Sequence, residues 1–286
     1  MLILELLVQG LIQGGIYALI AIGLTLVYGL LRILHVAHAG LYALGGYCAI
    51  LLTNAFGSFT LALVGSMLFV GIVGMVVYRV FYQPLLDKPP FVALIASIGL
   101  FIAMEEIFRI IFGAYGLTFL APPLQGAVII SSIYLRQAEI ASIVLAIVLI
   151  AGLSLFTKYS RIGIAWRATV TDPEMAESFG VDVLKVRYLN FFIGSAMAAA
   201  AGSMVALLNN LVEPTMGSVP SYKALAIIVL GGLGNVKGTL IASLAIGIAE
   251  AFGTIYLGNV LDRDSIAFAF LIIVLMLKPH GLFTKG

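Results

Sequence analysis

The chain has 286 residues, of which 62% are hydrophobic and only 10% charged, and its formal net charge is +2. Soluble domains carry about a quarter charged residues, so this composition excludes an ordinary soluble domain and indicates a membrane protein. The small net charge and the spread of basic residues over loops argue against a nucleic-acid partner. The length fits one transmembrane domain over residues 1–286, and Cys48, as the sole cysteine, excludes an internal disulfide.

Long apolar segments recur along the whole chain. A spanning helix needs about 20 mainly apolar residues. The predicted spans are residues 6–31, 39–53, 60–82, 91–112, 139–157, 188–208, 238–257 and 264–278. Glycine and alanine are frequent inside them and favour close packing between membrane helices. We therefore expect an all-α polytopic membrane protein with about eight transmembrane helices.

The segment from Lys223 to Gly231 is apolar at its centre but too short to cross a membrane, because the Gly-rich run after it interrupts the pattern. This favours a half-membrane or re-entrant helix, whose irregular backbone must lie against protein or water. The Gly-rich run is not a phosphate loop, since Lys237 is followed by Gly238 and no strand precedes it.

The loop of residues 158–187 concentrates the charge of the chain. The chain has 15 basic and 13 acidic residues, and nine of these charged residues lie in this loop. Residues 171–174 form a capping-box pattern in which Thr171 or Asp172 accepts from free backbone N–H groups, and Pro173 suits a first helical turn. Gly180 can end the helix. The pattern predicts a short helix over 173–179, and the alternative is an ordinary solvated loop.

Basic loops predict how the chain is oriented. Loops 83–90 and 158–187 are expected inside, which places the amino terminus and residues 113–138 outside. Lys278 and Lys285 also favour the inside for the carboxyl terminus. Both conditions hold only if the segment at 222–232 crosses the membrane or if another segment is miscounted, so the number of crossings stays open.

Some charged side chains fall inside predicted spans. Glu105, Glu106 and Arg109 mark a pathway or an interfacial pairing, with Glu105 and Arg109 four residues apart. Glu250 has two readings: it accepts from a donor on a neighbouring span, or it carries protons in a secondary transporter.

No catalytic motif is present, and no enzyme activity, cofactor or metal site is expected. His35 and His38 are three residues apart but lack carboxylates beside them, and His280 is isolated. We expect packed or interfacial roles for these histidines rather than metal binding.

Three stretches resemble the permease subunits of ABC importers for branched-chain amino acids, of the high-affinity leucine, isoleucine and valine type. The first is YALIAIGLTLVYG at 17–29, and the third is VLGGLGNVKG at 229–238. The second lies in the charged loop, as SRIG at 160–163, RA at 167–168, DPEMA at 172–176 and FGV at 179–181. The family commonly has Asn-Phe-Ala-His-Gly-Glu after its first span, whereas this chain has HVAHAG at 35–40 and no acidic residue.

The resemblance implies a multi-pass protein of a bacterial or archaeal cytoplasmic membrane, surrounded by lipid. It also implies a second, related permease subunit, two ATP-binding subunits and an extracytoplasmic substrate-binding protein. The helix at 173–179 would then couple ATP hydrolysis to the spans, with Met175, Ala176 and Phe179 filling a groove in the ATPase. The residues expected in coupling are Arg161, Arg167, Thr171, Asp172, Pro173, Glu174, Met175, Ala176, Phe179 and Gly180.

The predicted translocation path follows the first spans and the Gly-rich break, where polar groups stand next to small residues. Its residues are Thr25, Tyr28, His38, Gly231, Gly232 and Asn235. The substrate expected is a branched-chain or other hydrophobic amino acid, with urea, amides, sugars and nucleosides as alternatives within the same class. A stand-alone secondary transporter or channel is the other class left open, because broken helices suit it too.

Overall fold

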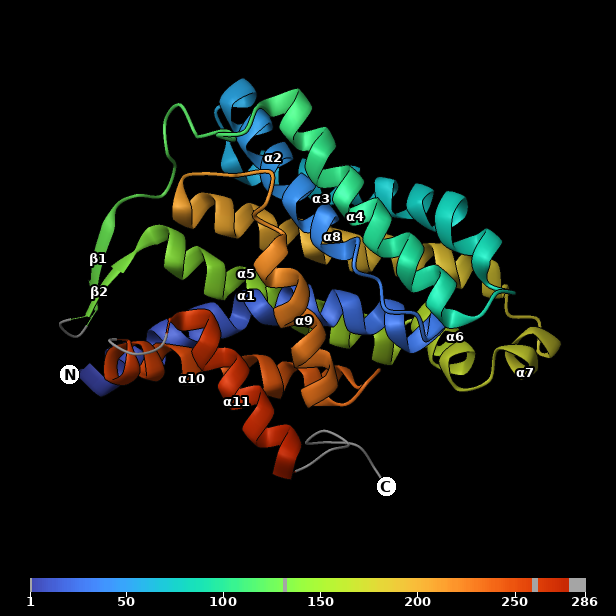
Figure 1. The fold of residues 1–286 in the computed structure, drawn as a ribbon. Coiled ribbons are helices and arrows are strands. Elements are labelled where there is room, and N and C mark those ends of the chain that lie inside the picture. The colour runs from blue at the N-terminus through green and yellow to red at the C-terminus, as the bar shows by residue number, and fades with distance from the viewer. Residues whose placement is uncertain (1, 131–132, 259–261, 278–286) are drawn as a thin grey trace.

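The computed structural model describes residues 2–130, 133–258 and 262–277 of the chain. In these ranges it is built almost wholly from helices, as Figure 1 shows. The elements are α1 (Leu2–Leu31), α2 (His38–Phe56), α3 (Phe59–Val77), α4 (Pro90–Phe112), β1 (Ala127–Ile130), β2 (Ile133–Arg136), α5 (Gln137–Tyr159), α6 (Arg161–Thr171), α7 (Pro173–Ser178), α8 (Val183–Asn209), α9 (Ser218–Gly231), α10 (Val236–Leu257) and α11 (Arg263–Leu277).

Seven helices in the described part of the chain are long and apolar enough to cross a membrane: α1 to α5, α8 and α10, with α3 counted together with the turns that continue it. They match seven of the predicted spans. The eighth predicted span is α11, which has 15 residues and is therefore shorter than the about 20 that a full crossing needs. The predicted half-length helix is confirmed as α9, which has 14 residues and ends at the Gly-rich turn.

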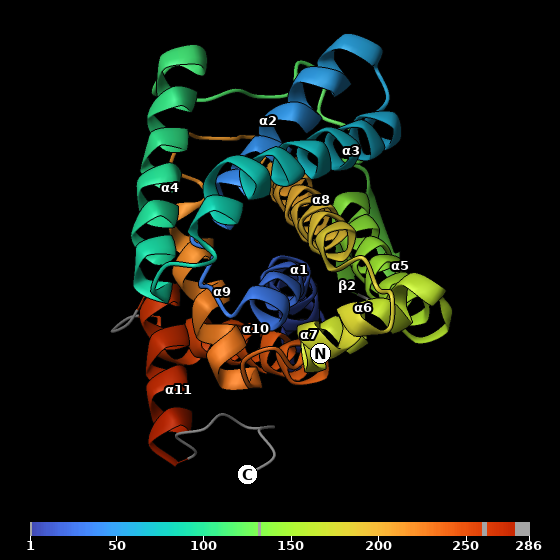
Figure 2. The same cartoon turned by 90° about the vertical axis from the view of Figure 1, so that its right-hand side faces the viewer.

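Helix α1 is the centre of the bundle, and α5, α8, α9 and α10 pack around it (Figure 2). It is apolar on all sides and most of its residues from Gly10 to Val27 are buried, as expected for a helix surrounded by others. A Cβ atom on Gly10 would lie 2.7 Å from the Ile248 Cα of α10. Glycine at this position is thus what lets the two backbones approach so closely.

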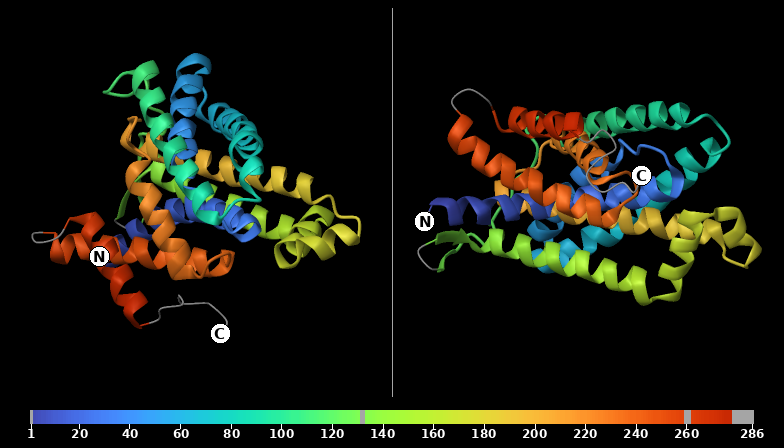
Figure 3. Two further views of the ribbon diagram at one scale, coloured as in Figure 1. Left: turned by 45° about the vertical axis from the view of Figure 1, so that its right-hand side comes forward. Right: turned by 90° about the horizontal axis from the view of Figure 1, so that it is seen from below.

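The loops gather at two opposite ends of the bundle. One end, here called the basic end, carries the turn at 83–89 and helices α6 and α7, and the Tyr188 hydroxyl donates to Gln83 Oε1 at 3.1 Å across it. The far end carries the start of α1, the β1–β2 pair and the loop at 210–217. There Leu117 and Val212 pair through their backbones. Figure 3 shows α6 and α7 projecting from the basic end.

This grouping of loops agrees with the predicted orientation. The chain leaves the far end at 210–217, and α9 delivers it to the basic end, where Gly231 packs against Gly238 at the start of α10. The loop at 210–217 and the half-length helix α9 therefore connect the two ends together. Lys278, His280 and Lys285 lie outside the described residues.

Two local features were not expected from the sequence. Residues 127–136 contain an antiparallel strand pair, with Ala127 opposite Arg136 and Ile130 opposite Ile133, within the connection at 113–138. In addition, α3 continues through a π turn (Tyr78–Tyr82) and a short 3-10 turn (Gln83–Leu85). Such π turns often mark functional positions, and this one places Tyr82 in the core.

Candidate coupling and translocation sites

Helix α7 is the element that the sequence singled out, and its structure follows from its end signals. The Asp172 carboxylate accepts the Met175 backbone N–H at 3.0 Å and so caps the helix, while Pro173 occupies its first turn. Gly180, with φ of +82°, lets the chain turn away after Phe179. The predicted helix is confirmed, ending at Ser178.

The predicted cap is confirmed as Asp172, one of the two expected acceptors, but the reciprocal bond of a capping box does not form. Asp172 rather than Thr171 is the capping residue, so Glu174 falls one position short of the place from which it would reach back. The Thr171 hydroxyl instead donates to the Arg167 carbonyl at 3.0 Å, inside the preceding helix. The Asp172 carboxylate caps the helix rather than the Thr171 hydroxyl, because a charged acceptor forms the stronger hydrogen bond to the free N–H groups.

The residues of α7 divide into an inward and an outward set. Ala176 is buried against the rest of the chain, so it offers no surface to a partner. Met175 and Phe179 are 56% and 82% exposed and project from the basic end. The other predicted coupling residues, apart from Ala176, are exposed as well: Arg161, Arg167, Thr171, Asp172, Pro173, Glu174 and Gly180.

A second helix in the charged loop, α6, escaped sequence reasoning. Its first turn is capped by the Ser160 hydroxyl, which accepts the Gly163 N–H at 2.8 Å. The loop is closed on its other side by Asp182, which accepts the Lys185 N–H at 3.0 Å. This bond, with a further one to the Lys185 side chain, holds the pKa of the Asp182 carboxyl below its usual value. The cap of α8 therefore stays ionised at neutral pH.

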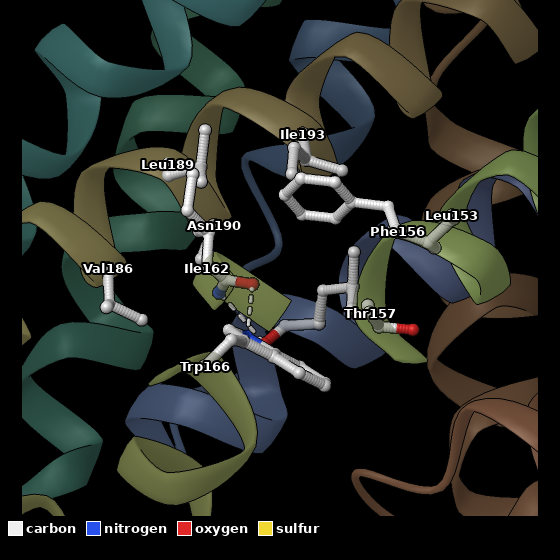
Figure 4. A pocket seen from close by; sticks show the side chains of 10 residues that line it. Leu153, Phe156, Thr157, Ile162, Trp166, Val186, Leu189, Asn190 and Ile193 are labelled. Carbon is white, nitrogen blue, oxygen red and sulfur yellow. Dashed lines mark hydrogen bonds between the residues drawn. The ribbon is translucent and has the colours of Figure 1, made fainter. Parts of the chain in front are cut away.

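Helix α6 is connected to the bundle through the chain's only tryptophan. The Trp166 indole N–H donates to Asn190 Oδ1 at 3.0 Å, and Asn190 Nδ2 donates to the Leu26 carbonyl at 2.9 Å (Figure 4). A small cavity of about 20 Å³ lies beside this contact, lined mainly by apolar side chains such as Phe156 and Ile193. Consequently the charged loop, α8 and the central helix α1 are joined by two buried or half-buried hydrogen bonds.

The predicted path residues on α1 and at the Gly-rich turn come together. The Thr25 hydroxyl shares a hydrogen bond with the Thr239 hydroxyl at 2.9 Å, next to the contact between Gly231 and the start of α10. Gly232 has φ of +92°, a conformation that glycine adopts without strain. Asn235 caps α10 by accepting the Gly238 N–H at 3.1 Å. Tyr28, one turn beyond Thr25 on α1, is half-buried.

His38 lies away from that turn, deeper in the bundle. Its Nε2 is 3.2 Å from the Ile20 carbonyl, near the middle of α1, so α2 begins inside the bundle after a re-entrant loop at 32–37. His35 in this loop has its Nδ1 2.5 Å from the Tyr82 hydroxyl, which donates to Ser97 Oγ at 2.7 Å. Packed roles were predicted for both histidines, and both are indeed buried.

Each of these histidines also has one buried ring nitrogen without a hydrogen-bond partner, His35 Nε2 and His38 Nδ1. The two rings and Ser221 of α9 border the same small void. Unpaired buried polar atoms are costly, and a functional role or an ordered water is what usually accounts for one. The re-entrant loop therefore places polar groups inside the bundle, between α1, α2 and α9.

Glu250 lies in an ionic cluster whose members the sequence did not connect. It is fully buried, accepting the Tyr17 hydroxyl at 2.8 Å, Lys223 Nζ at 2.7 Å and Arg263 Nε at 2.8 Å. Lys223 is 4% exposed and also pairs with Asp264 at 2.7 Å. The cluster joins α1, α9, α10 and α11, and its two cations balance its two carboxylates. Of the two readings of Glu250, this geometry favours the structural one.

The charges on α4 pair differently from the prediction. Arg109 binds Glu106 at 2.6 Å, three residues away, instead of Glu105. Glu105 accepts the hydroxyl of Ser218, at the start of α9, at 2.6 Å. Arg109 and Glu106 are both largely exposed, as is usual for an interfacial pair. Within the described ranges, no group of three or more His, Cys, Asp or Glu side chains is placed to hold a metal ion.

A helical bundle with a short, capped helix projecting from one end, polar re-entrant segments and a buried ionic cluster has the features of a multi-pass membrane permease. Comparison with known proteins agrees. Residues 6–277 match the family described as "Branched-chain amino acid transport system / permease component", and the chain belongs to that family. It is a multi-pass protein of the cytoplasmic membrane, and its family is one of transport permeases, not a known class of enzyme.

Two curated relatives cover almost the whole chain. The high-affinity branched-chain amino acid transport system permease protein LivH of Escherichia coli (strain K12) is 33% identical over 96% of this chain and 93% of its own length. The corresponding protein BraD of Pseudomonas aeruginosa is 31% identical over 98% of this chain and 95% of its own. A solved structure of PsaBC from Streptococcus pneumoniae in complex with Fab has a TM-score of 0.53, covering 95% of this chain and 91% of that one, at 13% identity. This last likeness concerns the fold alone.

Proposed function

We propose that this chain, as one transmembrane domain over residues 1–286, is the permease subunit of an ATP-driven importer of branched-chain amino acids. The names of LivH and BraD support the substrate class. The observation that carries the proposal is α7 itself, a capped helix that exposes Met175 and Phe179 at the basic end. An exposed apolar pair on a short, well-ended helix suits insertion into a groove of a partner protein.

The route from that helix into the membrane is short. α7 follows α6 directly, and α6 is bonded through Trp166 and Asn190 to the backbone of α1 at Leu26. Thr25, which precedes Leu26 in α1 and points in another direction, bonds to Thr239 at the start of α10. A displacement of the charged loop is thus transmitted to the two helices that meet at the Gly-rich turn. The proposed translocation path lies toward the basic end of the bundle. Its residues are Thr25, Tyr28, His38, Gly231, Gly232 and Asn235.

The partners follow from this assignment. Uphill transport needs a source of energy, which two ATP-binding subunits supply, one of them docked on the loop at 158–187 with α7 as the coupling element. A second, related permease subunit completes the pathway, and a substrate-binding protein delivers the amino acid at the far end. Permeases of the ABC importer class imply all three kinds of partner.

A secondary transporter is the competing function, and the ionic cluster weighs against it. Its natural proton carrier would be Glu250, but this carboxylate is held by Lys223, Arg263 and Tyr17 at once. These contacts tie the carboxylate to α1, α9 and α11 at once, which is the arrangement of a structural cluster rather than of a group open to exchange. ATP hydrolysis requires no such group.

The test is uptake into proteoliposomes that contain the complete importer. With ATP inside the vesicle at the ATPase side, radiolabelled leucine, isoleucine and valine are expected to accumulate. Dissipating the proton gradient with an uncoupler leaves uptake unchanged, whereas a non-hydrolysable ATP analogue abolishes it. Uptake that follows the proton gradient without ATP would favour the secondary transporter, and uptake of urea, sugars or nucleosides alone would change the substrate class.

A further inference from the structure

A cavity of about 320 Å³ lies beside the ionic cluster, in the half of the bundle nearer the far end. Its wall is formed by α1, α2, the end of α8, the loop at 210–217, α9 and the start of α11. The lining combines apolar side chains with both signs of charge: Gln13, Ile16, Tyr17, Ile20, Tyr42, Val205, Asn209, Glu213, Met216, Val219, Pro220, Lys223, Arg263 and Asp264. Cavities of about 300–1,000 Å³ are typical of small-molecule sites.

The charges of this wall are not equally available to a ligand. Lys223 is engaged by Glu250, Asp264 and Tyr17, which use its three N–H donors. Arg263 binds Glu250 through Nε only, and among the described residues its two terminal nitrogens form no hydrogen bond or ion pair. The Glu213 carboxylate, which is exposed, likewise forms neither in the part of the chain that the structure describes. One free cationic fork and one free carboxylate therefore face the same cavity.

The apolar part of the wall gives the remaining recognition element. Ile16 and Ile20 come from α1, Met216 from the loop and Val219 from α9. These side chains are aliphatic and include a methionine, which adapts its shape to different apolar groups. A ligand with an ammonium group, a carboxylate and a branched aliphatic side chain has a counterpart in the cavity for each part. A sugar or urea could form hydrogen bonds with these groups but would supply a counter-charge to neither.

A second cavity of about 320 Å³ shares Gln13, Asn209 and Arg263 with the first. It is bordered by Gln9 of α1 and by Arg136 and Glu139 at the start of α5, close to the far end. Polar groups thus line a way from that end to the first cavity, and Arg263 stands where the two meet.

We propose that the first cavity is a transient binding site for a zwitterionic aliphatic amino acid, with Arg263 holding the carboxylate, Glu213 the ammonium group, and Ile16, Ile20, Met216 and Val219 the side chain. The proposal rests on the proposed function, and it assigns to this chain a selection step separate from that of the binding protein. Affinity is expected to be low, because the amino acid must leave again toward the basic end.

The experiment measures protection of a thiol in the cavity. Val219→Cys is introduced with Cys48→Ser, so that the new thiol is the only one, and the importer is assembled in proteoliposomes without ATP and without the binding protein. A small water-soluble thiosulfonate then labels the cysteine. Millimolar L-leucine is expected to slow labelling, while 4-methylpentanoate and 3-methylbutylamine, which each lack one of the two charges, have no effect at the same concentration.

Adding Glu213→Gln is expected to abolish the protection by leucine. The same substitution with the native Val219 and Cys48 should raise the KM for leucine uptake about tenfold or more, as loss of a charge-assisted hydrogen bond predicts. Glu106→Gln, a matched change on the outside of α4, leaves both measurements unchanged. Absence of protection in the parent, equal protection by the singly charged analogues, or protection that survives Glu213→Gln overturns the proposal.

Labelling and uptake test the cavity site and the proposed function separately. Labelling needs neither ATP nor a binding protein, so it reports on the cavity even if the parent importer fails to take up leucine. Protection without ATP-driven uptake refutes the proposed function and supports the cavity site. Normal uptake without protection refutes the cavity site and leaves the proposed function standing.

Discussion

Replacing Glu250 by leucine is expected to destabilise the folded protein strongly. The side chain is fully buried at the point where α1, α9, α10 and α11 meet, and it accepts three hydrogen bonds there. Leucine has a similar volume but no acceptor. Lys223, which is 4% exposed, then keeps only Asp264 as a counter-charge.

The size of the stability loss depends on which charge is left buried without its counter-charge. Removing one partner of a buried ion pair costs about 3–5 kcal/mol, mostly because the other charge stays buried. Arg263 is about half exposed, so water screens it and its loss contributes little. Asp264 still compensates Lys223 in part. We therefore expect about 3 kcal/mol, which corresponds to a fall in Tm of about 5 °C for a chain of this size.

The assay is thermal unfolding of the purified permease in detergent, followed by Trp166 fluorescence and by the monodisperse fraction in size-exclusion chromatography. The double variant Lys223→Met/Glu250→Leu removes both members of the pair and leaves Arg263 beside Asp264. It should recover more than half of the lost stability, because the stranded charge is gone. A Tm of Glu250→Leu equal to the parent's, or losses that simply add in the double variant, would refute this reasoning.

Glu250→Gln keeps the size of the side chain and one acceptor, so it should unfold between the parent and Glu250→Leu and largely preserve uptake. Trp166→Phe keeps an aromatic side chain but removes the indole N–H that links α6 to the bundle. It should lower substrate-stimulated ATP hydrolysis while shifting the unfolding free energy by only about 1 kcal/mol. Gly45→Leu should reduce the folded yield in membranes severely, because even a Cβ atom there would lie 2.3 Å from the Ala199 Cα. In a cysteine-free background, a cysteine at half-buried Tyr28 should react with a water-soluble thiol reagent in the resting importer, whereas one at buried Thr25 should be protected; equal rates would contradict the packing of α1.

The parts that sequence reasoning predicted correctly depend on local signals. Spans follow from runs of apolar residues, and α7 follows from Asp172, Pro173 and Gly180, each of which acts within one helical turn. α9 was recognised as a half-length helix because the glycines after it interrupt the pattern. The missed α6 had a local signal as well, the capping serine at position 160, but the charges around it resembled a solvated loop.

The parts that were missed depend on partners far apart in the chain. Glu250 was noticed as a buried carboxylate, but Tyr17 is 233 residues away from it and no spacing rule connects them. Lys223 was taken as the border of an apolar segment instead of a buried residue. A usable signal did exist, since an isolated acidic residue in one apolar segment and an isolated basic residue in another suggest a pair. The re-entrant start of α2 at His38 had no comparable signal.

Coupling through α7 is tested most directly by measuring leucine uptake and ATP hydrolysis in the same proteoliposomes for Met175→Glu and for Tyr115→Glu. Tyr115 is the matched control, because it is 94% exposed and lies two residues before Leu117, which pairs with Val212 at the far end of the bundle. Forcing a carboxylate into an apolar groove of the ATPase costs several kcal/mol, so Met175→Glu should lose uptake more than tenfold and should no longer respond to the loaded binding protein. Tyr115→Glu should behave as the parent does. Full, ATP-driven uptake by correctly assembled Met175→Glu would contradict the account.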